Sequence, residues 1–402
     1  MRYSQLFGRT TKNIAADADS INAKLLTQAG FINKELAGVY SYLPLGLQVL
    51  TKIQNIVREE MNQLGAQEIL LPVLSSCQKW QKTGRDKLTV LYRLGQLVLN
   101  PTHEEVVTPL VQQYVFSYRD LPLAVYQIQE KFRHEPRAKS GLLRNLEFNM
   151  KDLYSFHADE KDLDKFYNQV IETYRRIFNR LNLGEITFLT YASGGSFSKY
   201  SHEFQTICPT GEDLIYLCDQ CQVAVNKELI EEQKTCPKCN SANLVEKKAI
   251  EVANIFKLGT KFSAAFGFNY TNEQGELRPV LMGCYGLGPS RLMGTLVEVF
   301  HDDRGIIWPE VAAPYPIHLV GLDPKAEEIY HKLGENNVLF DDRKEVTPGV
   351  KLTDADLIGL PWRWLVSSKS LQAGGIEIKR RNSNKIKIIP VDDAILKYGQ
   401  TR

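Results

Sequence analysis

Apolar residues recur along the chain with helical spacing in some segments and with strand spacing in others. Between residues 46 and 64 they return every three or four positions, which predicts an amphipathic helix that ends at Gly65. The next segment, 67–74, reads QEILLPVL and predicts a buried strand, although Pro72 lacks the amide proton that a central strand needs. We therefore expect this strand at a sheet edge, for which a second subunit is one candidate cover.

Two further apolar segments flank a basic loop in the middle of the chain. The strings LAVYQIQEKFR and NLEFNMKDLYSFH predict two antiparallel strands, and a helix is expected at about 160–182. The loop between the strands holds residues that are, or can become, cations: Arg133, His134, Arg137, Lys139 and Arg144. A charge run is often only a solvated surface, so a plain hairpin tip and a cradle for an anion both remain open.

Helix start signals flank this hairpin on both sides. A strand at 97–99 is followed by PTHEE, in which Thr102 and Glu105 have the spacing of a capping box. Much later, RPVLMGCYGLGPSRLMGTL predicts a strand, a glycine turn and a helix, with Pro289 at the first helical position and Arg291 in the first turn. A helix N-terminus with an arginine is an anion site, but a tight turn explains the glycines equally well.

The last quarter of the chain changes to alternating strands and helices. The proline-rich segment 308–316 predicts a linker. Beyond it, PIHLVGL, NVLFDD and WRWLVSS predict strands, separated by helices at about 324–334 and 349–358. Two more strands and a terminal helix complete a small α/β domain with a parallel or mixed sheet. We therefore expect two domains, residues 1–310 and 311–402.

Composition narrows the class of protein. The chain has 402 residues, of which 43% are hydrophobic, so that it can bury a large core. A net charge of +2 provides no global positive field, and any contact with RNA must come from local patches. We find no apolar run of the roughly 18 residues that a membrane span needs and no signal peptide. These features predict a cytoplasmic protein without a membrane partner.

Four of the seven cysteines form two C-x-x-C pairs. These are Cys218, Cys221, Cys236 and Cys239. Two such turns bring four thiolates together tetrahedrally, which suits a closed, structural Zn²⁺ site, with redox pairs or core cysteines as the alternative. We expect Cys77, Cys208 and Cys284 to be small buried hydrophobic residues.

Taken in order, these segments resemble the class II aminoacyl-tRNA synthetases, and more closely the bacterial-type prolyl-tRNA synthetases, over nearly the whole chain. The resemblance is carried by GLQVLTKIQNIVREEMNQLGAQEILLPVL (motif 1), PTHEE, FRHE with RNLEFNMKDLYSFH (motif 2), SHEF, GCYGLGPSR (motif 3) and LFDDRKEVTPGVKLTDADLIGLP. It implies an α+β fold with an antiparallel sheet flanked by helices, a four-cysteine insertion at 205–250 and a C-terminal α/β anticodon-binding domain. It also implies a homodimer with motif 1 at the interface.

The resemblance further implies ATP-dependent activation of proline to prolyl-adenylate and transfer of the prolyl group to tRNA(Pro), with Mg²⁺ bridging the phosphates. The implied ATP-binding residues are Arg133, Glu135, Arg144, Phe148, Gln205 and Arg291, of which Arg133 and Arg291 are the catalytic ones. The implied proline-binding residues are Thr102, Glu104, Arg133 and His157, and Glu203 is expected near Mg²⁺. The candidate anticodon-binding residues are Asp342, Arg343 and Lys351, although pairing with a neighbouring acid explains Arg343 equally well.

Simple electrostatics agrees with the implied reaction. A carboxylate that attacks an α-phosphate brings two anions together, and fixed guanidinium groups oppose that cost without reorganising. Two other functions stay open: a class II synthetase for another amino acid such as threonine, and a synthetase-like, non-catalytic RNA-binding or regulatory protein. The threonine enzymes use an active-site metal, for which we see no open ligand set.

The chain also departs from the family pattern. Relatives often insert an editing domain between motifs 2 and 3, but only 14 residues separate Cys221 from Cys236. We therefore expect no editing activity of its own. Extra residues precede SHEF, and Ala253 and Asn254 stand where relatives often have glycine and histidine, which affects local loop geometry and not the reaction.

Overall fold

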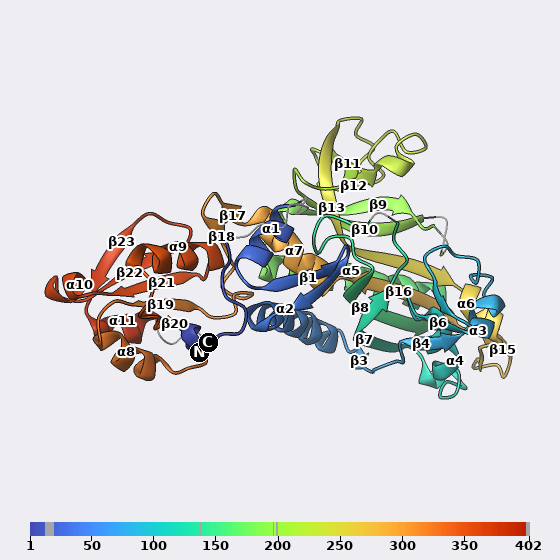
Figure 1. Ribbon diagram of the computed structural model, residues 1–402. Coiled ribbons are helices and arrows are strands. Elements are labelled where there is room, and N and C mark those ends of the chain that lie inside the picture. Colours follow the sequence, from blue (N-terminus) through green and yellow to red (C-terminus); the bar gives the residue numbers. More distant parts are fainter. Residues whose placement is uncertain (13–19, 137, 196, 198–199, 399–402) are drawn as a thin grey trace. The chain divides into compact units, whose positions relative to one another are not determined.

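The computed structural model describes residues 1–12, 20–136, 138–195, 197 and 200–398 (Figure 1). Its contacts divide the chain into two compact units. The larger unit comprises 37–39 and 54–295, and the second unit comprises 1–36, 40–53 and 296–402. None of the helices in the described ranges is both long and apolar enough to cross a membrane.

A nine-stranded sheet is the centre of the larger unit, in the order β10-β9-β12-β11-β13-β16-β8-β7-β3. Its strands are β3 (Gln67–Glu68), β7 (Leu123–Phe132), β8 (Glu147–His157), β9 (Thr187–Ser193), β10 (Tyr200–Ile207), β11 (Asp213–Cys218), β12 (Ala224–Asn226), β13 (Leu244–Gly259) and β16 (Leu281–Leu287). The pairs β3–β7 and β9–β12 are parallel and the other pairs are antiparallel, which confirms the predicted, mainly antiparallel sheet.

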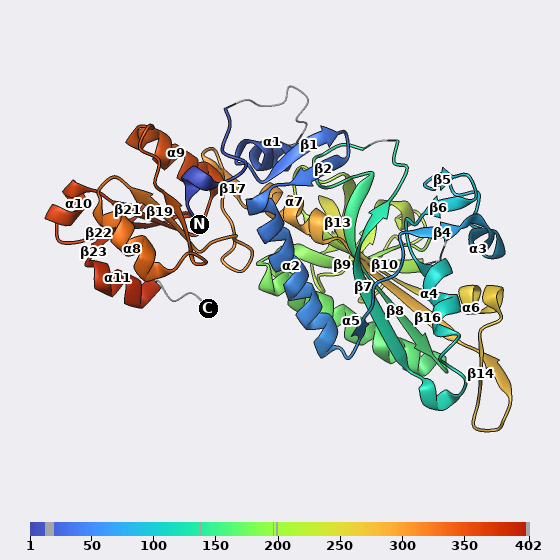
Figure 2. The ribbon, with the colours of Figure 1, turned by 60° about the horizontal axis from the view of Figure 1, so that its bottom comes forward.

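Helices cover both faces of this sheet. Figure 2 shows α5 (Glu160–Arg180), the helix predicted at about 160–182, along one face of β8 and β16. It starts where the Asp159 carboxylate accepts a hydrogen bond from the Asp162 amide, and its buried side is apolar and aromatic. The helices α4 (Glu104–Val111) and α6 (Lys261–Phe266) pack on the other face, in the core that contains Tyr154, Phe156 and Met282.

Short elements complete the larger unit. They are a three-stranded sheet of β4 (Leu74–Ser76), β6 (Leu97–Leu99) and β5 (Tyr92–Leu94), the hairpin of β14 (Asn269–Thr271) and β15 (Leu277–Pro279), the helix α3 (Cys77–Lys82), and the 3₁₀ turns η2 (Tyr118–Asp120), η3 (Gly184–Ile186) and η4 (Lys227–Leu229). The predicted strand at 97–99 is therefore confirmed as β6.

The predicted strand at 67–74 is only partly correct. It is an edge strand, as expected, but β3 ends at Glu68 and the segment 69–73 is irregular. The reason lies in β7, whose side chains replace the ladder: Gln127 accepts from the Leu71 amide at 3.0 Å, and Gln129 donates to the Leu71 carbonyl at 2.8 Å. The prediction of full burial is also wrong, because Leu70 is 75% exposed.

The second unit contains a five-stranded mixed sheet in the order β20-β19-β21-β22-β23, which confirms the predicted α/β domain. Its strands are β19 (Ile317–Gly321), β20 (Val338–Asp341), β21 (Trp362–Val366), β22 (Ile376–Arg380) and β23 (Ile386–Ile389), with the helices α8 (Lys325–Leu333), α9 (Pro348–Ile358), α10 (Ser368–Gln372) and α11 (Val391–Tyr398). The pairs β19–β20 and β19–β21 are parallel and the others antiparallel.

Further elements lie outside these two sheets. They are η1 (Tyr3–Gln5), α1 (Ile21–Gln28), the paired strands β1 (Ile32–Leu36) and β2 (Val39–Tyr42), α2 (Pro44–Gln63), α7 (Pro289–Val299), and the paired strands β17 (His301–Asp302) and β18 (Gly305–Ile306). The helix predicted at 46–64 is thus found as α2, followed by Gly65 at a φ of +87°. The helix predicted after the glycine turn is α7, with Pro289 in first position.

The segment 308–316, predicted as a linker, is packed within the second unit. Trp308 is 3% exposed and packs against Phe31, with ring centroids 5.2 Å apart, and Ala313 is fully buried. The Lys52 ammonium donates to the Ala313 carbonyl at 2.6 Å. Its apolar residues hold it in the core of the second unit, so the prolines mark a bend in a packed segment.

Candidate active site

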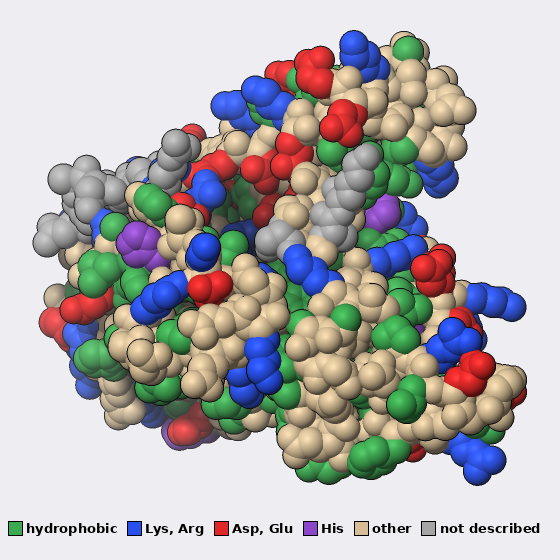
Figure 3. Space-filling model, turned by 90° about the vertical axis from the view of Figure 1, so that its right-hand side faces the viewer, with side chains coloured by type: hydrophobic (Ala, Val, Ile, Leu, Met, Phe, Trp, Pro, Cys, Tyr) green, Lys and Arg blue, Asp and Glu red, His purple; other side chains and the backbone are tan. Residues whose placement is uncertain are grey.

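The basic loop is the tip of the β7–β8 hairpin, as predicted. The Arg133 amide donates to the Leu146 carbonyl at 2.8 Å, and Lys139 and Arg144 form an antiparallel bridge within the loop. Figure 3 shows a hollow on this side of the molecule in which acidic and basic side chains gather. Five predicted ATP-binding residues line one pocket: Arg133, Glu135, Arg144, Phe148 and Arg291. Arg137 lies outside the described residues.

Two guanidinium groups face this pocket from different elements. Arg133 follows β7, and its guanidinium carbon lies 5.1 Å from the centroid of the Phe148 ring. Arg291, in the first turn of α7, donates to the Glu251 carbonyl at 2.8 Å. Burial lowers the pKa of Arg133, and the like charge of Arg291 lowers it further. The two guanidinium groups thus line one pocket, where each can bind an anionic group of a ligand.

Carboxylates form the opposite side of the same site. The Gln205 side-chain amide of β10 donates to Glu203 at 2.9 Å and to Asp213 at 2.8 Å. Gln205 also lies opposite Glu251, which belongs to the paired strand β13. Burial, followed by repulsion from Glu251, raises the pKa of Glu203 to about 8. Burial likewise raises the pKa of Asp213. Oxygen atoms of this kind are the ligands that Mg²⁺ prefers, and a cation here would relieve the repulsion.

Thr102 and Glu104 lie together, but they do not form the predicted capping box. The Thr102 hydroxyl donates to the Glu104 carboxylate at 2.7–2.8 Å, and α4 begins at Glu104 without a side-chain cap. Glu105, the expected partner of Thr102, instead pairs with Arg85 at 3.0 Å. Glu104 and Glu105 are both buried and share one cation, Arg85. The Glu105 carboxylate is therefore held in this ion pair and does not cap the helix.

Sequence reasoning missed two neighbours of the Glu104 carboxylate. Arg85 lies 3.1 Å from one oxygen, and the Cys284 thiol lies 3.2 Å from the other. Glu104 and Arg85 are fully or almost fully buried, at 0% and 5% exposure. The Arg133 guanidinium donates to the Pro101 carbonyl at 3.4 Å, which connects Arg133 to the segment that carries Thr102 and Glu104.

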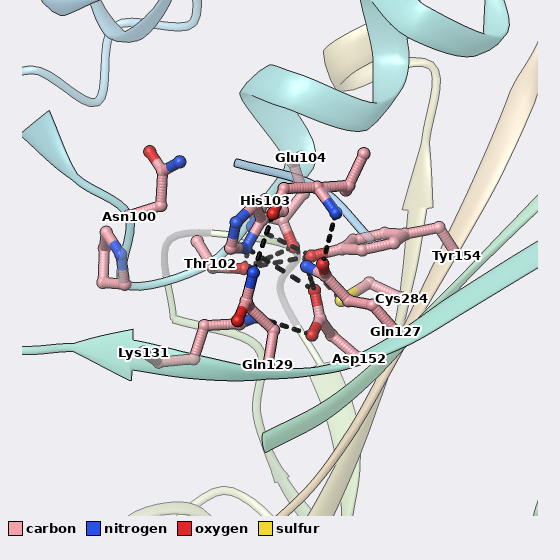
Figure 4. A network of polar contacts seen from close by, with 12 residues as sticks. Asn100, Thr102, His103, Glu104, Gln127, Gln129, Lys131, Asp152, Tyr154 and Cys284 are labelled. Atoms are coloured by element: carbon pink, nitrogen blue, oxygen red, sulfur yellow. Dashed lines mark hydrogen bonds and ion pairs between the residues drawn. The ribbon is translucent and has the colours of Figure 1, made fainter. Parts of the chain in front are cut away.

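A buried polar network supports this segment from below (Figure 4). Asp152 of β8 pairs with Lys131 of β7 at 2.7 Å and accepts from Gln127 at 2.9 Å. His103 approaches the same carboxylate at 3.7 Å and contacts the Pro72 carbonyl at 3.0 Å. Although burial alone would raise the pKa of Asp152, Lys131 holds it below its usual value.

The network keeps His103 neutral. Burial, followed by the Lys131 charge, lowers the pKa of His103 to about 4. The His103 amide donates to the Tyr154 hydroxyl at 2.9 Å, which ties the Thr102–Glu104 segment to β8. One sequence signal could have revealed the network: Gln127, Gln129 and Lys131 are polar residues at alternate positions, and therefore on one face, of a strand whose first half is apolar.

His157 is not brought together with Thr102 and Glu104. Its ring contacts Asp162 at 2.6 Å and Ser155 at 2.8 Å, on the face of the sheet that α5 covers. Tyr154, which contacts the Thr102–Glu104 segment, points to the other face, because successive residues of β8 alternate. The structure thus gives His157 a structural contact with α5, and we do not carry it into the proposed proline site.

The four predicted zinc ligands converge. The Sγ atoms of Cys218, Cys221, Cys236 and Cys239 all lie within 4.8 Å of one another. Each C-x-x-C turn is closed in the same way, with Gln222 and Asn240 in the left-handed region at φ +57° and +59°. Four thiols in this arrangement fit a tetrahedral zinc site. Cys77, Cys208 and Cys284 are buried outside the cluster, as predicted.

The three candidate anticodon-binding residues line one pocket of the second unit. Arg343 is only 7% exposed and is held by Asp341, at 2.6 and 2.9 Å, and by Asp354, at 2.8 Å. Lys351 is 3% exposed and donates to the Gly321 and Asp341 carbonyls. The structure thus supports the alternative explanation for Arg343, pairing with neighbouring acids, and leaves Asp342 as the accessible member.

Comparison with known proteins identifies the family. Residues 92–300 match the class II core domain of tRNA synthetases (G, H, P, S and T), and residues 315–398 match an anticodon-binding domain. The chain is 39% identical to the proline–tRNA ligase of Anaplasma phagocytophilum over 98% of this chain and 99% of that protein. The chain belongs to the proline–tRNA ligase family. It is also 38% identical to the ligase of Wolbachia pipientis wMel, over 98% of this chain and 99% of the relative.

Longer members of the family also align with this chain. The proline–tRNA ligase of Dehalococcoides mccartyi (strain CBDB1) is 33% identical over 558 aligned positions, which cover 98% of each protein and exceed the 402 residues present here. Among solved structures, the prolyl-tRNA synthetase of Giardia lamblia in complex with prolyl-adenylate has a TM-score of 0.77 at 20% identity, over 97% of this chain and 78% of that one. That similarity shows the fold.

Membership of the proline–tRNA ligase family confirms the predicted enzyme class, a class II aminoacyl-tRNA synthetase, and its fold. The comparisons favour neither a synthetase for another amino acid nor a non-catalytic relative. The roles of the individual site residues stay predictions, which the geometry above now constrains.

Proposed function

We propose that the protein activates proline with ATP in the pocket between β7, β8, β13 and α7, and then transfers the prolyl group to tRNA(Pro). The observation that carries this proposal is the convergence of Arg133 and Arg291 on one pocket, with Arg133 bonded to the Pro101 carbonyl next to the segment that carries the buried Glu104. Two cations beside an anion match a substrate pair in which a triphosphate lies next to an amino acid.

Arg133 and Arg291 are proposed to bind the α-phosphate and the substrate carboxylate. A proline carboxylate oxygen forms a bond to the α-phosphorus while the bond to the bridging oxygen breaks, and pyrophosphate leaves with that electron pair. No protein base is needed, because the nucleophile is already an anion, so positioning and charge stabilisation are the protein's contribution. Phe148 offers its ring to the adenine, next to the Arg133 guanidinium.

Glu104 and Thr102 are proposed to bind the proline nitrogen. A secondary ammonium has two protons and one positive charge, which a carboxylate and a hydroxyl oxygen can satisfy together. Arg85 already takes one contact of Glu104 and thereby fixes the orientation of the carboxylate, leaving its negative charge for the substrate. In the second step, the 3′ adenosine hydroxyl of the tRNA attacks the prolyl carbonyl carbon, and AMP leaves.

Metal ions are assigned from the donor groups. Glu203, with Asp213 and Glu251, offers carboxylate oxygens beside the phosphate pocket, which supports a site for Mg²⁺ bound with ATP. The ion would neutralise charge on the outer phosphates, near Arg144. The four-cysteine cluster would hold a structural Zn²⁺, since a four-thiolate site leaves no position for a substrate.

A homodimer is proposed from exposed leucines around motif 1. Leu70 is 75% exposed, Leu74 40%, Leu94 55% and Leu97 43%, and three of them lie on the small sheet β4-β6-β5. Apolar side chains gathered in this way favour a protein partner.

Three sequence-based expectations remain part of the proposal. The domain boundary near residue 310 is supported by the gap between the two family matches, which end at 300 and begin at 315. A cytoplasmic location and the lack of an editing activity rest on the sequence alone.

Proline-dependent exchange of pyrophosphate into ATP tests the proposal directly. We expect exchange with proline and far less with threonine or alanine. Arg291→Ala should lower kcat/KM for ATP by roughly a hundredfold or more. Lys139→Ala is the matched control, because Lys139 is a cation of the same hairpin tip with a side chain 53% exposed, and its loss should change kcat/KM less than about threefold. Equal effects of the two substitutions, or exchange with threonine alone, would contradict the proposal.

A further inference from the structure

The N-terminal residues form part of the C-terminal sheet. The Phe340 amide donates to the Met1 carbonyl at 2.9 Å, and Arg2 forms a parallel bridge with Phe340 of β20. β20 is an outer strand of the five-stranded sheet, so this segment covers an edge that would otherwise leave its amides unpaired.

The same segment fixes the side chain of Asp342. The Ser4 amide donates to Asp342 Oδ1 at 2.9 Å, and the Ser4 hydroxyl donates to Oδ2 at 2.8 Å. Arg2 adds a contact to Oδ2 at 3.4 Å while it pairs with Glu327. Although burial opposes ionisation, these donors hold the pKa of Asp342 below its usual value. The carboxylate is therefore ionised and held in one orientation.

Tyr3 contacts a second residue of this pocket. The Tyr3 ring is fully buried, and the Arg343 guanidinium carbon lies 4.2 Å from its centroid. Arg343 is thus enclosed between this ring and the carboxylates of Asp341 and Asp354. The side chains of Arg2, Asp342, Arg343 and Lys351 line one pocket together with Glu327.

We propose that Arg2, Tyr3 and Ser4 are positioning residues of the anticodon-binding pocket, with Ser4 orienting Asp342 toward the anticodon bases. The inference rests on the proposed function and on the predicted role of this pocket in anticodon binding, which the match of residues 315–398 to an anticodon-binding domain supports. Single-stranded loops are read by polar side chains on the edges of splayed bases. A carboxylate already held by Ser4 loses little freedom on binding, which favours affinity.

Ser4→Ala tests the inference, because it removes one hydroxyl and leaves the backbone pairing in place. We expect the KM for tRNA in aminoacylation to rise about tenfold, as expected for one lost hydrogen bond to a charged group. The effect should fall on tRNA and not on proline-dependent pyrophosphate exchange, which needs no tRNA. Ser4→Thr keeps the hydroxyl and should restore the KM. Lys332→Ala, which removes an exposed cation paired with Asp392, is the control for charge and stability in the same domain.

A double-variant cycle separates positioning from general stability. If Ser4 acts through Asp342, then Ser4→Ala should have no further effect on the tRNA KM in an Asp342→Ala background. A tRNA KM within twofold of the wild type in Ser4→Ala, multiplicative effects in the double variant, or an equal loss of pyrophosphate exchange would each overturn the inference. Absence of proline-dependent exchange in the wild-type protein would instead refute the proposed function.

Discussion

Lys131→Met tests the buried network beneath the Thr102–Glu104 segment. The substitution keeps the length of the side chain and removes the charge that lies 2.7 Å from Asp152, at a position with 0% exposure. Asp152 itself is 2% exposed and would keep only Gln127, at 2.9 Å, and the more distant His103. Breaking one side of such a buried ion pair costs about 3–5 kcal/mol.

The assay is thermal unfolding at neutral and at acidic pH. For a unit of this size, a loss of about 3–5 kcal/mol corresponds to a fall in Tm of roughly 6–20 °C. In the variant, the unpaired Asp152 has a folded-state pKa above its unfolded value, so the penalty is present at neutral pH and is relieved as the pH falls through the folded pKa. We therefore expect the difference in Tm from the wild type to shrink as the pH is lowered from neutrality.

The double variant Lys131→Met with Asp152→Asn is the matched control. Removing both charges leaves no buried ion without a partner, so more than half of the lost Tm should return. A single variant within about 2 °C of the wild type at neutral pH would refute the reasoning. So would a double variant that is no more stable than the single one.

Two further predictions concern metal ions. Cys236→Ser should lose a zinc ion that the wild-type protein retains through dialysis. Cys77→Ser changes a buried cysteine outside the cluster and should keep the ion. Equal zinc content of the two variants by elemental analysis would contradict the assignment. The KM for Mg²⁺ with ATP should fall as the pH rises through about 8, because the Glu203 carboxyl loses its proton there. Glu203→Gln should abolish this dependence of KM on pH, and circular dichroism checks that the variant is folded. A slope that persists in the variant would assign the titration to another group.

Elements with a clear period could be predicted from the sequence alone. The two hairpin strands, α5 and the alternating C-terminal strands were found where the pattern places them, because one face of each is buried. The strand predicted at 67–74 was wrong over most of its length for a nonlocal reason. The Leu71 amide and carbonyl form hydrogen bonds with Gln127 and Gln129, which lie more than fifty residues away in the sequence. An apolar run indicates that a segment is buried in a core, but it does not indicate which groups form hydrogen bonds with the backbone of that segment.

The residues of the candidate site likewise differ in whether local sequence patterns predict them. Residues inside the quoted motifs, such as Arg133, Phe148 and Arg291, were brought to one pocket as expected. Arg85 lies outside those motifs, and no local pattern indicates that it would reach Glu104 and Glu105. For His157, the position within the motif does not indicate which face of β8 the side chain occupies, and in the structure the side chain contacts Asp162 of α5.

The cations of the β7–β8 loop are of two kinds, and this resolves the two interpretations left open by its sequence. Arg144 and Lys139 are partly exposed and pair with Glu135 and Glu212, as a solvated hairpin tip would. Arg133 instead lies against Phe148 and donates to the neutral Pro101 carbonyl, and the like charge of Arg291 disfavours its charged form. Binding of a triphosphate would therefore relieve repulsion at Arg133, whereas Arg144 must first exchange its carboxylate partners for phosphate oxygens. It follows that Arg133 should contribute more to ATP affinity than Arg144, although both arise from the same short loop.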